Sequence, residues 1–122
     1  NTYYVLHIRC DDTQFYTQFN DDNLYREIYN LKLPKNTIVI SNNYSIKKII
    51  HAIFKYPYID IQASHFANTD ISGIENTVID YIILSKSIHT YCFSYYGHGS
   101  GLSEQCSVLH NIPYTVSCIE IN

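Results

Sequence analysis

The sequence contains no methionine, no long apolar run and no cysteine pair at zinc-ribbon spacing. Because even an initiating methionine is missing, we expect the 122 residues to be part of a longer protein. No stretch approaches the roughly 20 apolar residues that a membrane-spanning helix needs. The N-terminus also lacks the pattern of a signal peptide. These absences predict a chain without a membrane segment and favour a cytoplasmic location.

Positive charge is also scarce. The chain has 8 lysines and arginines against 11 aspartates and glutamates, for a formal net charge of −3. Proteins that bind nucleic acid through their overall charge need a basic surface to neutralise phosphates. The composition therefore argues against a nucleic-acid partner. With 46% hydrophobic and 16% charged residues, the chain is typical of a globular domain.

The four cysteines show no C-x-x-C spacing, which makes a zinc ribbon an unfavourable interpretation. They are Cys10, Cys92, Cys106 and Cys118. Two lie in strand-like runs and Cys106 lies on an apolar helical stripe. We therefore expect small buried hydrophobic side chains in a reducing compartment, although a disulfide stays open.

Short β-rich apolar runs alternate with amphipathic helical stretches along the chain. Strands are predicted at residues 2–8, 36–40, 58–63, 88–93 and 114–121. Between them, apolar residues recur at helical spacing, as in the stripe Leu102, Cys106 and Leu109. Ser72 and Glu75 form a capping-box pattern for the helix before residue 85. This alternation predicts one α/β domain over residues 1–122, a Rossmann-like doubly wound parallel sheet of about five strands with helices on both faces.

In such a sheet, the carboxyl ends of the strands lie along one edge, where ligands usually bind. Arg9, Asn42, His65 and the loop 94–101 follow strands and are expected at this edge. The loop contains a G-x-G-x-G pattern that ends at Gly101 and opens a helix, whose N-terminus suits a phosphate. Glycine-rich turns also occur for backbone geometry alone, so the pattern is a weak signal by itself. Arg9 follows an apolar run, which favours an anionic partner for its guanidinium.

Taken in order, these motifs resemble those of the nucleotide-sugar-binding half of the fucosyltransferase superfamily, which has a GT-B fold. That family's first motif is H-x-R-R-x-D, which stands here as HIRCDD at residues 7–12. A middle motif of an apolar strand followed by S/T-D-D or S-D-N stands as IVISNN at residues 38–43, and the last motif matches DYIILS at 80–85 and GSGLS at 99–103. Cys10 replaces the second arginine of the first motif, and Asn42 and Asn43 replace the acidic pair of the middle one.

The resemblance implies roles for individual residues. Arg9 would hold the β-phosphate of GDP-fucose and act as the catalytic residue, while His7 would lie beside the sugar nucleotide. Asp80 would take part in nucleotide binding, and Ser100 would meet the phosphates at a helix N-terminus. The full predicted substrate-binding set is His7, Arg9, Asp12, Ser41, Asn43, His65, Asp80, His98, Gly99, Ser100 and Gly101.

The implied reaction is an inverting, metal-independent glycosyl transfer from GDP-fucose or another GDP-sugar to a glycan or protein, without a cofactor. The family's fold has two Rossmann-like halves, and 122 residues accommodate one of them. We therefore expect an acceptor-binding domain outside this chain. The isolated chain should bind the donor and transfer the sugar poorly or not at all.

Other functions stay open. A flavodoxin- or receiver-like binding module has a similar alternation of strands and helices at this length, and Asp11 and Asp12 fit the acidic cluster of a receiver. A metal-dependent hydrolase could use His7, Asp12, His65 and His98, although no two of them have the spacing of a known metal motif. A non-catalytic interaction domain that keeps the fold without the site is a further alternative.

Overall fold

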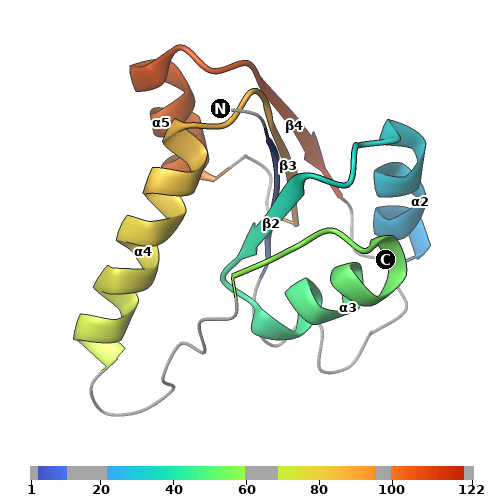
Figure 1. Cartoon of the computed structure of the whole chain (residues 1–122), viewed down its shortest axis with the longest axis horizontal. Helices are drawn as coiled ribbons and strands as arrows, with labels where there is room; N and C mark the ends of the chain where they lie inside the picture. Colours follow the sequence, from blue (N-terminus) through green and yellow to red (C-terminus); the bar gives the residue numbers. More distant parts are fainter. Residues whose placement is uncertain (1–2, 11–21, 60–68, 96–99, 120–122) are drawn as a thin grey trace.

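The computed structural model describes residues 3–10, 22–59, 69–95 and 100–119, with the backbone alone over 69–76 (Figure 1). Strands and helices alternate as the sequence predicts, except that no strand separates α3 from α4 in the described part of the chain. In chain order they are β1 (Tyr4–Arg9), α2 (Asp22–Leu31), β2 (Thr37–Ser41), α3 (Tyr44–Phe54), α4 (Thr69–Ser85), β3 (Thr90–Ser94), α5 (Gly101–His110) and β4 (Tyr114–Cys118).

The strands form one parallel sheet in the order β2-β1-β3-β4. Val5 of β1 pairs with Ile38 on one side and with Thr90 on the other, so β1 is a central strand. The predicted parallel α/β sheet is confirmed, with four strands in place of about five. The predicted strand at 58–63 contributes one isolated parallel bridge, between Tyr58 and Val39, and residues 60–63 lie outside the described part.

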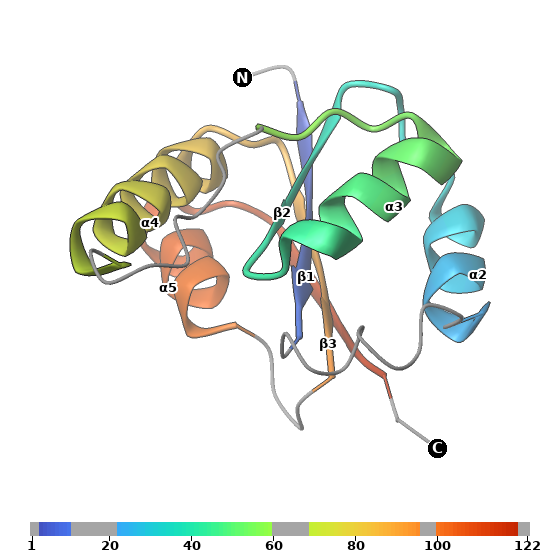
Figure 2. The same cartoon turned by 90° about the horizontal axis from the view of Figure 1, so that it is seen from below.

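Helices cover both faces of the sheet, α2 and α3 on one side and α4 and α5 on the other (Figure 2). Side chains alternate along a strand, so neighbouring residues of β1 enter different cores. Leu6 and Ile8 pack in the core on the α2 and α3 side. Val5 packs with Ile83 and Cys106 on the α4 and α5 side. By the same alternation, His7 and Arg9 lie on the α4 and α5 side.

Helical periodicity placed most apolar stripes correctly. Leu24 and Ile28 of α2, which recur at helical spacing, are buried against the sheet. In α5, however, Leu109 is 72% exposed, so its predicted burial is wrong. His110, in the same last turn, bonds to Tyr81 of α4 at 2.9 Å, so the turn contacts α4 while the side chain of Leu109 stays exposed. The capping-box prediction is also wrong, because α4 begins at Thr69 and Ser72 lies inside the helix.

The cysteines are all free thiols in this structure. Cys10, Cys92 and Cys106 are buried, as predicted, whereas Cys118 is exposed at the end of the outermost strand. Among the described helices, none has the length and apolar character needed to cross a membrane.

Candidate functional site

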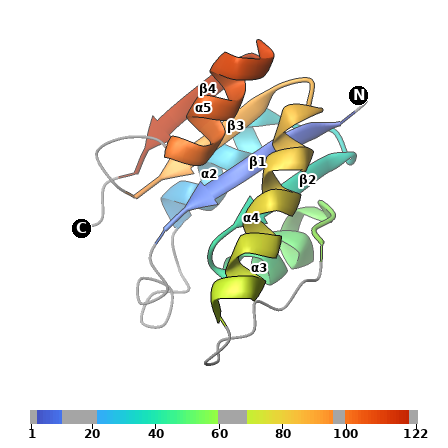
Figure 3. The same cartoon turned by 90° about the vertical axis from the view of Figure 1, so that its left-hand side faces the viewer.

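The carboxyl ends of three adjacent strands are level with one another. Arg9 at the end of β1 pairs with Ser94 at the end of β3, and Ile8 pairs with Ser41 at the end of β2. The arrowheads in Figure 3 point toward this edge. The predicted gathering of polar strand ends at one edge is therefore present for Arg9 and Asn42, while His65 lies outside the described residues.

His7 is the most unusual polar residue at this edge. Only 7% of its surface is exposed, because β1 has a neighbouring strand on each side and α4 and α5 cover the face on which His7 lies. Burial, followed by the nearby positive charge of Arg9, lowers the pKa of His7 to about 4. The imidazole is therefore neutral at physiological pH. Its Nδ1 atom is buried and has no hydrogen-bond partner among the described residues, which is uncommon for a buried polar atom and favours a ligand contact.

Two serines at the start of α5, Ser100 and Ser103, lie on the same side of the sheet as His7. Ser100 is the N-cap residue, and its backbone carbonyl accepts a hydrogen bond of 2.9 Å from the amide of Glu104. Its hydroxyl makes no capping hydrogen bond, although the side chain is buried. Ser103 lies one turn along and bonds at 3.0 Å to the hydroxyl of Tyr114. The Ser100 hydroxyl is thus not committed to stabilising the helix.

Tyr114 of β4 lies beside these serines and bonds to Ser103. Burial is the main cause that raises the pKa of its phenol, and hydrogen bonds with Ser103 and Cys92 also act on it. The phenol therefore stays protonated and can donate. Sequence analysis did not select Ser103 or Tyr114 as site residues. The available signal was the spacing of Ser100 and Ser103, which places two hydroxyls on one turn of a helix.

Gly101 follows the cap and begins the helix. A Cβ atom at this position would meet no described atom within 4 Å. Glycine is therefore not required here by contacts with the described protein or by a positive φ angle. The space over the first turn is open. An anion could approach the free amides there, where the helix dipole is positive.

The middle motif supports the fold in this structure. Ser41 donates a hydrogen bond of 2.7 Å to the carbonyl of Ile8 and accepts one of 3.1 Å from the amide of Asn43. Asn42 bonds through its side chain to both backbone groups of Cys10. Asn43 caps α3 by accepting from the amide of Ile46 at 3.2 Å. These contacts tie the exits of β1 and β2 together, so Ser41 and Asn43, both predicted to bind substrate, have clear structural roles.

Replacing Asn43 with alanine should lower the free energy of unfolding by about 1 kcal/mol, because a buried cap residue is lost. Urea unfolding measures the change. Asn30→Ala is the matched control, because Asn30 is exposed on α2, and it should change stability by less than about 0.5 kcal/mol. Equal stability of Asn43→Ala and the parent protein would show that the side chain does not cap α3.

Asp80 lies on α4 and is partly buried, next in sequence to Ile79, which packs against Ile83 in the core on the α4 and α5 side. Its pKa is raised to about 6, mainly because burial disfavours the carboxylate, while the positive charge of Lys47 on α3 acts in the opposite direction. Lys47, not Arg9, is thus the cation that acts on Asp80. The charged group that influences the pKa of Asp80 therefore differs from the one that influences His7, which is Arg9.

Four of the predicted site residues lie outside the described residues, namely Asp12, His65, His98 and Gly99. Cys10 is fully buried and packs in the core on the α2 and α3 side, so it points away from the face that carries Arg9. In the described part of the chain, no group of three or more His, Cys, Asp or Glu side chains could hold a metal ion.

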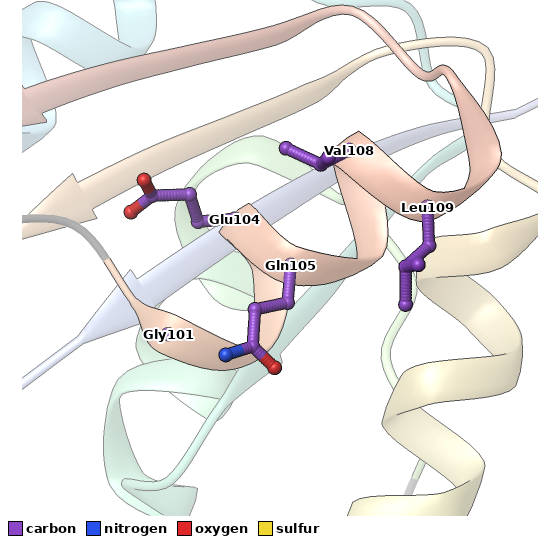
Figure 4. A pocket seen from close by; sticks show the side chains of 5 residues that line it. All are labelled: Gly101, Glu104, Gln105, Val108 and Leu109. Atoms are coloured by element: carbon purple, nitrogen blue, oxygen red, sulfur yellow. The ribbon is translucent and has the colours of Figure 1, made fainter.

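A depression of about 550 Å³ lies on the outer surface of α5 (Figure 4). Its described lining consists of Gly101, Glu104, Gln105, Val108 and Leu109. Only Gly101 of this lining belongs to the predicted site, and the other four residues follow it along α5. The depression therefore meets the polar edge at Gly101 alone. Searches of protein-family models and of curated proteins find no match to the chain.

Proposed function

We propose that this chain is the donor-binding domain of a glycosyltransferase that uses a GDP-sugar, with GDP-fucose as the favoured donor. One observation carries the proposal. His7 and Arg9 lie on the central strand, on the sheet face that α5 covers, and the N-terminus of α5 is open above Gly101. A guanidinium, a neutral imidazole and a helix N-terminus on one side of a carboxyl edge suit a pyrophosphate.

Each group has a distinct role in this proposal. Arg9 offers two parallel N–H donors to the β-phosphate, which is the geometry that a guanidinium provides and a lysine does not. The Ser100 hydroxyl and the amides at the start of α5 bind the second phosphate. His7 is neutral, because its pKa is about 4, so it forms a hydrogen bond to the sugar nucleotide and adds no charge.

The proposed reaction follows from where negative charge develops. The acceptor hydroxyl attacks the anomeric carbon and gives up its proton to water, the bond from that carbon to the β-phosphate oxygen breaks, and GDP leaves with the bonding electrons. Arg9 and the α5 N-terminus stabilise the charge that grows on the leaving phosphate. A preorganised donor of this kind typically contributes about 3 to 4 kcal/mol to the transition state.

The rest of the proposal depends on the motif resemblance. Guanine as the base, fucose as the sugar and a second domain for the glycan or protein acceptor are all taken from it. In that arrangement the present chain binds the donor, and transfer requires the acceptor-binding domain.

Ligand titration tests the proposal directly. We expect GDP to raise the melting temperature in the presence of EDTA, and UDP and ADP to do so less. At about a hundred times its dissociation constant, a ligand adds roughly 2.7 kcal/mol to the free energy of unfolding. Stabilisation by Mg²⁺ or Zn²⁺ alone would instead support a hydrolase or receiver. No response to any of the three nucleotides would contradict the proposed donor site.

A further inference from the structure

Tyr114, the first residue of β4, joins three elements of the fold through one hydroxyl group. Its oxygen lies 3.0 Å from the hydroxyl of Ser103, in the first turn of α5. The backbone of Ser100 and the thiol of Cys92 also hydrogen-bond to it. A phenol hydroxyl donates one hydrogen bond and accepts about two, so these partners use its full capacity. The hydroxyl therefore connects β4 and β3 with the beginning of α5.

The contact with Ser100 lies at the residue where α5 begins. It acts to lower the pKa of the Tyr114 phenol, which is the effect of a donating N–H group and not of a carbonyl. The amide of Ser100 therefore donates to the phenol oxygen, while its carbonyl accepts from the amide of Glu104 at 2.9 Å. The hydroxyl of Ser103 also donates to this carbonyl, at 3.5 Å. The backbone of Ser100 is thus fixed through both of its polar groups.

A separate observation on the same face of the sheet points to a ligand. His7 of β1 pairs in register with Cys92 of β3, so their side chains lie on the same face. The side chain of His7 is 7% exposed, and its Nδ1 atom has no hydrogen-bond partner within the described ranges. In the strand order, Cys92 lies between His7 and Tyr114. The hydrogen bonds of Tyr114 therefore extend to the neighbour of the buried nitrogen that lacks a protein partner.

We propose that Tyr114 is a positioning residue of the phosphate site, which holds the first turn of α5 in the orientation that receives the anion. The inference rests on the proposed function, because it takes the anion to be the pyrophosphate of the donor. Tyr114 does not contact the ligand, since protein groups occupy its hydroxyl. It acts through Ser100 and leaves the hydroxyl of that residue, with the amides that follow it, for the phosphate.

The physical basis is preorganisation. A turn that is already fixed loses little conformational freedom when the anion binds, so little of the binding free energy is spent on ordering it. Tyr114→Phe removes one oxygen atom and keeps the ring. The amide of Ser100 and the hydroxyl of Ser103 then lose a common partner, and the turn becomes more mobile. We expect the affinity for GDP to fall about fivefold or more.

Tyr56→Phe is the matched control. Tyr56 is also buried, and its hydroxyl donates a hydrogen bond of 3.1 Å to the carbonyl of Leu33 on the α2 and α3 side. The control variant loses the same atom and should bind GDP like the parent protein. Calorimetric titration in EDTA, at a temperature where both variants are folded, measures the difference. Ser103→Ala should weaken binding like Tyr114→Phe, and the double variant should bind about as well as either single variant, because the two hydroxyls act together.

Hydrogen exchange in the absence of ligand tests the positioning separately. The amide of Glu104 reports on the first turn, because it donates to the carbonyl of Ser100. It should exchange about fivefold faster in Tyr114→Phe than in Tyr56→Phe. Equal exchange in the two variants, or equal affinity for GDP, would overturn the role of Tyr114. If the parent protein binds no GDP and exchange is still faster in Tyr114→Phe, the donor site is contradicted and the control of the turn by Tyr114 is confirmed.

Discussion

Replacing Arg9 with alanine is expected to weaken GDP binding by about thirtyfold or more, which corresponds to roughly 2 kcal/mol. The physical reason is the loss of two charge-assisted hydrogen bonds from a half-buried side chain. Screening by water is reduced at such a position, so other groups cannot restore the interaction. Calorimetric titration of the two proteins with GDP, in EDTA, measures the difference.

The chain offers a close control for this substitution. Its other arginine, Arg26, is exposed on α2 and donates a hydrogen bond of 3.1 Å to Asn23. Arg26→Ala removes the same charge and should leave GDP affinity unchanged. Arg9→Lys keeps the charge without the planar fork and should give an intermediate affinity. If the alanine variants at both positions bind GDP equally well, Arg9 does not hold the phosphate.

Asp80→Asn is expected to stabilise the protein at pH 7 and to remove a pH dependence of stability. The pKa of Asp80 rises from 3.8 in the unfolded chain to about 6 in the folded protein. Between these values the unfolded chain loses its proton first, so stability falls as the pH rises from about 4 to about 6. Below this window both states are protonated and no cost remains.

The size of the effect follows from the pKa difference. About two pH units correspond to at most roughly 3 kcal/mol, and the partial exposure of Asp80 lowers this limit. Urea unfolding at pH 4 and pH 7 should show the difference between the parent protein and Asp80→Asn. Glu104→Gln is a suitable control, because it neutralises an exposed carboxylate on α5. A variant that is less stable than the parent at pH 7 would contradict the assignment of burial as the main cause.

The same variant bears on the proposed function. If the carboxylate takes part in nucleotide binding, as the motif resemblance implies, Asp80→Asn should bind GDP more weakly while it unfolds at a higher temperature. Opposite changes in affinity and stability are typical of groups retained for function in an unfavourable environment. If the affinity for GDP stays unchanged, Asp80 affects the stability of the fold and does not take part in nucleotide binding.

Much of the fold follows from local patterns. Short β-rich apolar runs locate β1 to β4 within a few residues, and alternation along a strand then assigns Leu6 and Arg9 to different faces before any coordinates are known. The burial of Leu24 and Ile28 follows from helical periodicity. The exposure of Leu109 does not follow from it, because an apolar stripe identifies one face of a helix and does not show which residues of that face other elements cover.

The candidate site is harder to predict because serine and asparagine serve two purposes. At a strand exit, either residue can bind a ligand or satisfy nearby backbone groups, and the sequence looks the same in both cases. Ser41 and Asn43 bond to the protein backbone here, while the Ser100 hydroxyl makes no cap. The depressed pKa of His7 depends on burial by segments distant in sequence, so no local pattern could indicate it.

The central position of β1 has a consequence for biosynthesis. Of the four described strands, β1 is synthesised first and β2 follows soon afterwards, but the other neighbour of β1 is β3, whose Thr90 pairs with Val5. During translation, which adds about 5 to 20 residues per second, the face of β1 that carries His7 and Arg9 has to wait for α4 and α5. The nascent chain thus completes its α2 and α3 framework first. The proposed phosphate site can be complete only after α5 has been synthesised, because Ser100 and the first turn of this helix follow every other described element except β4.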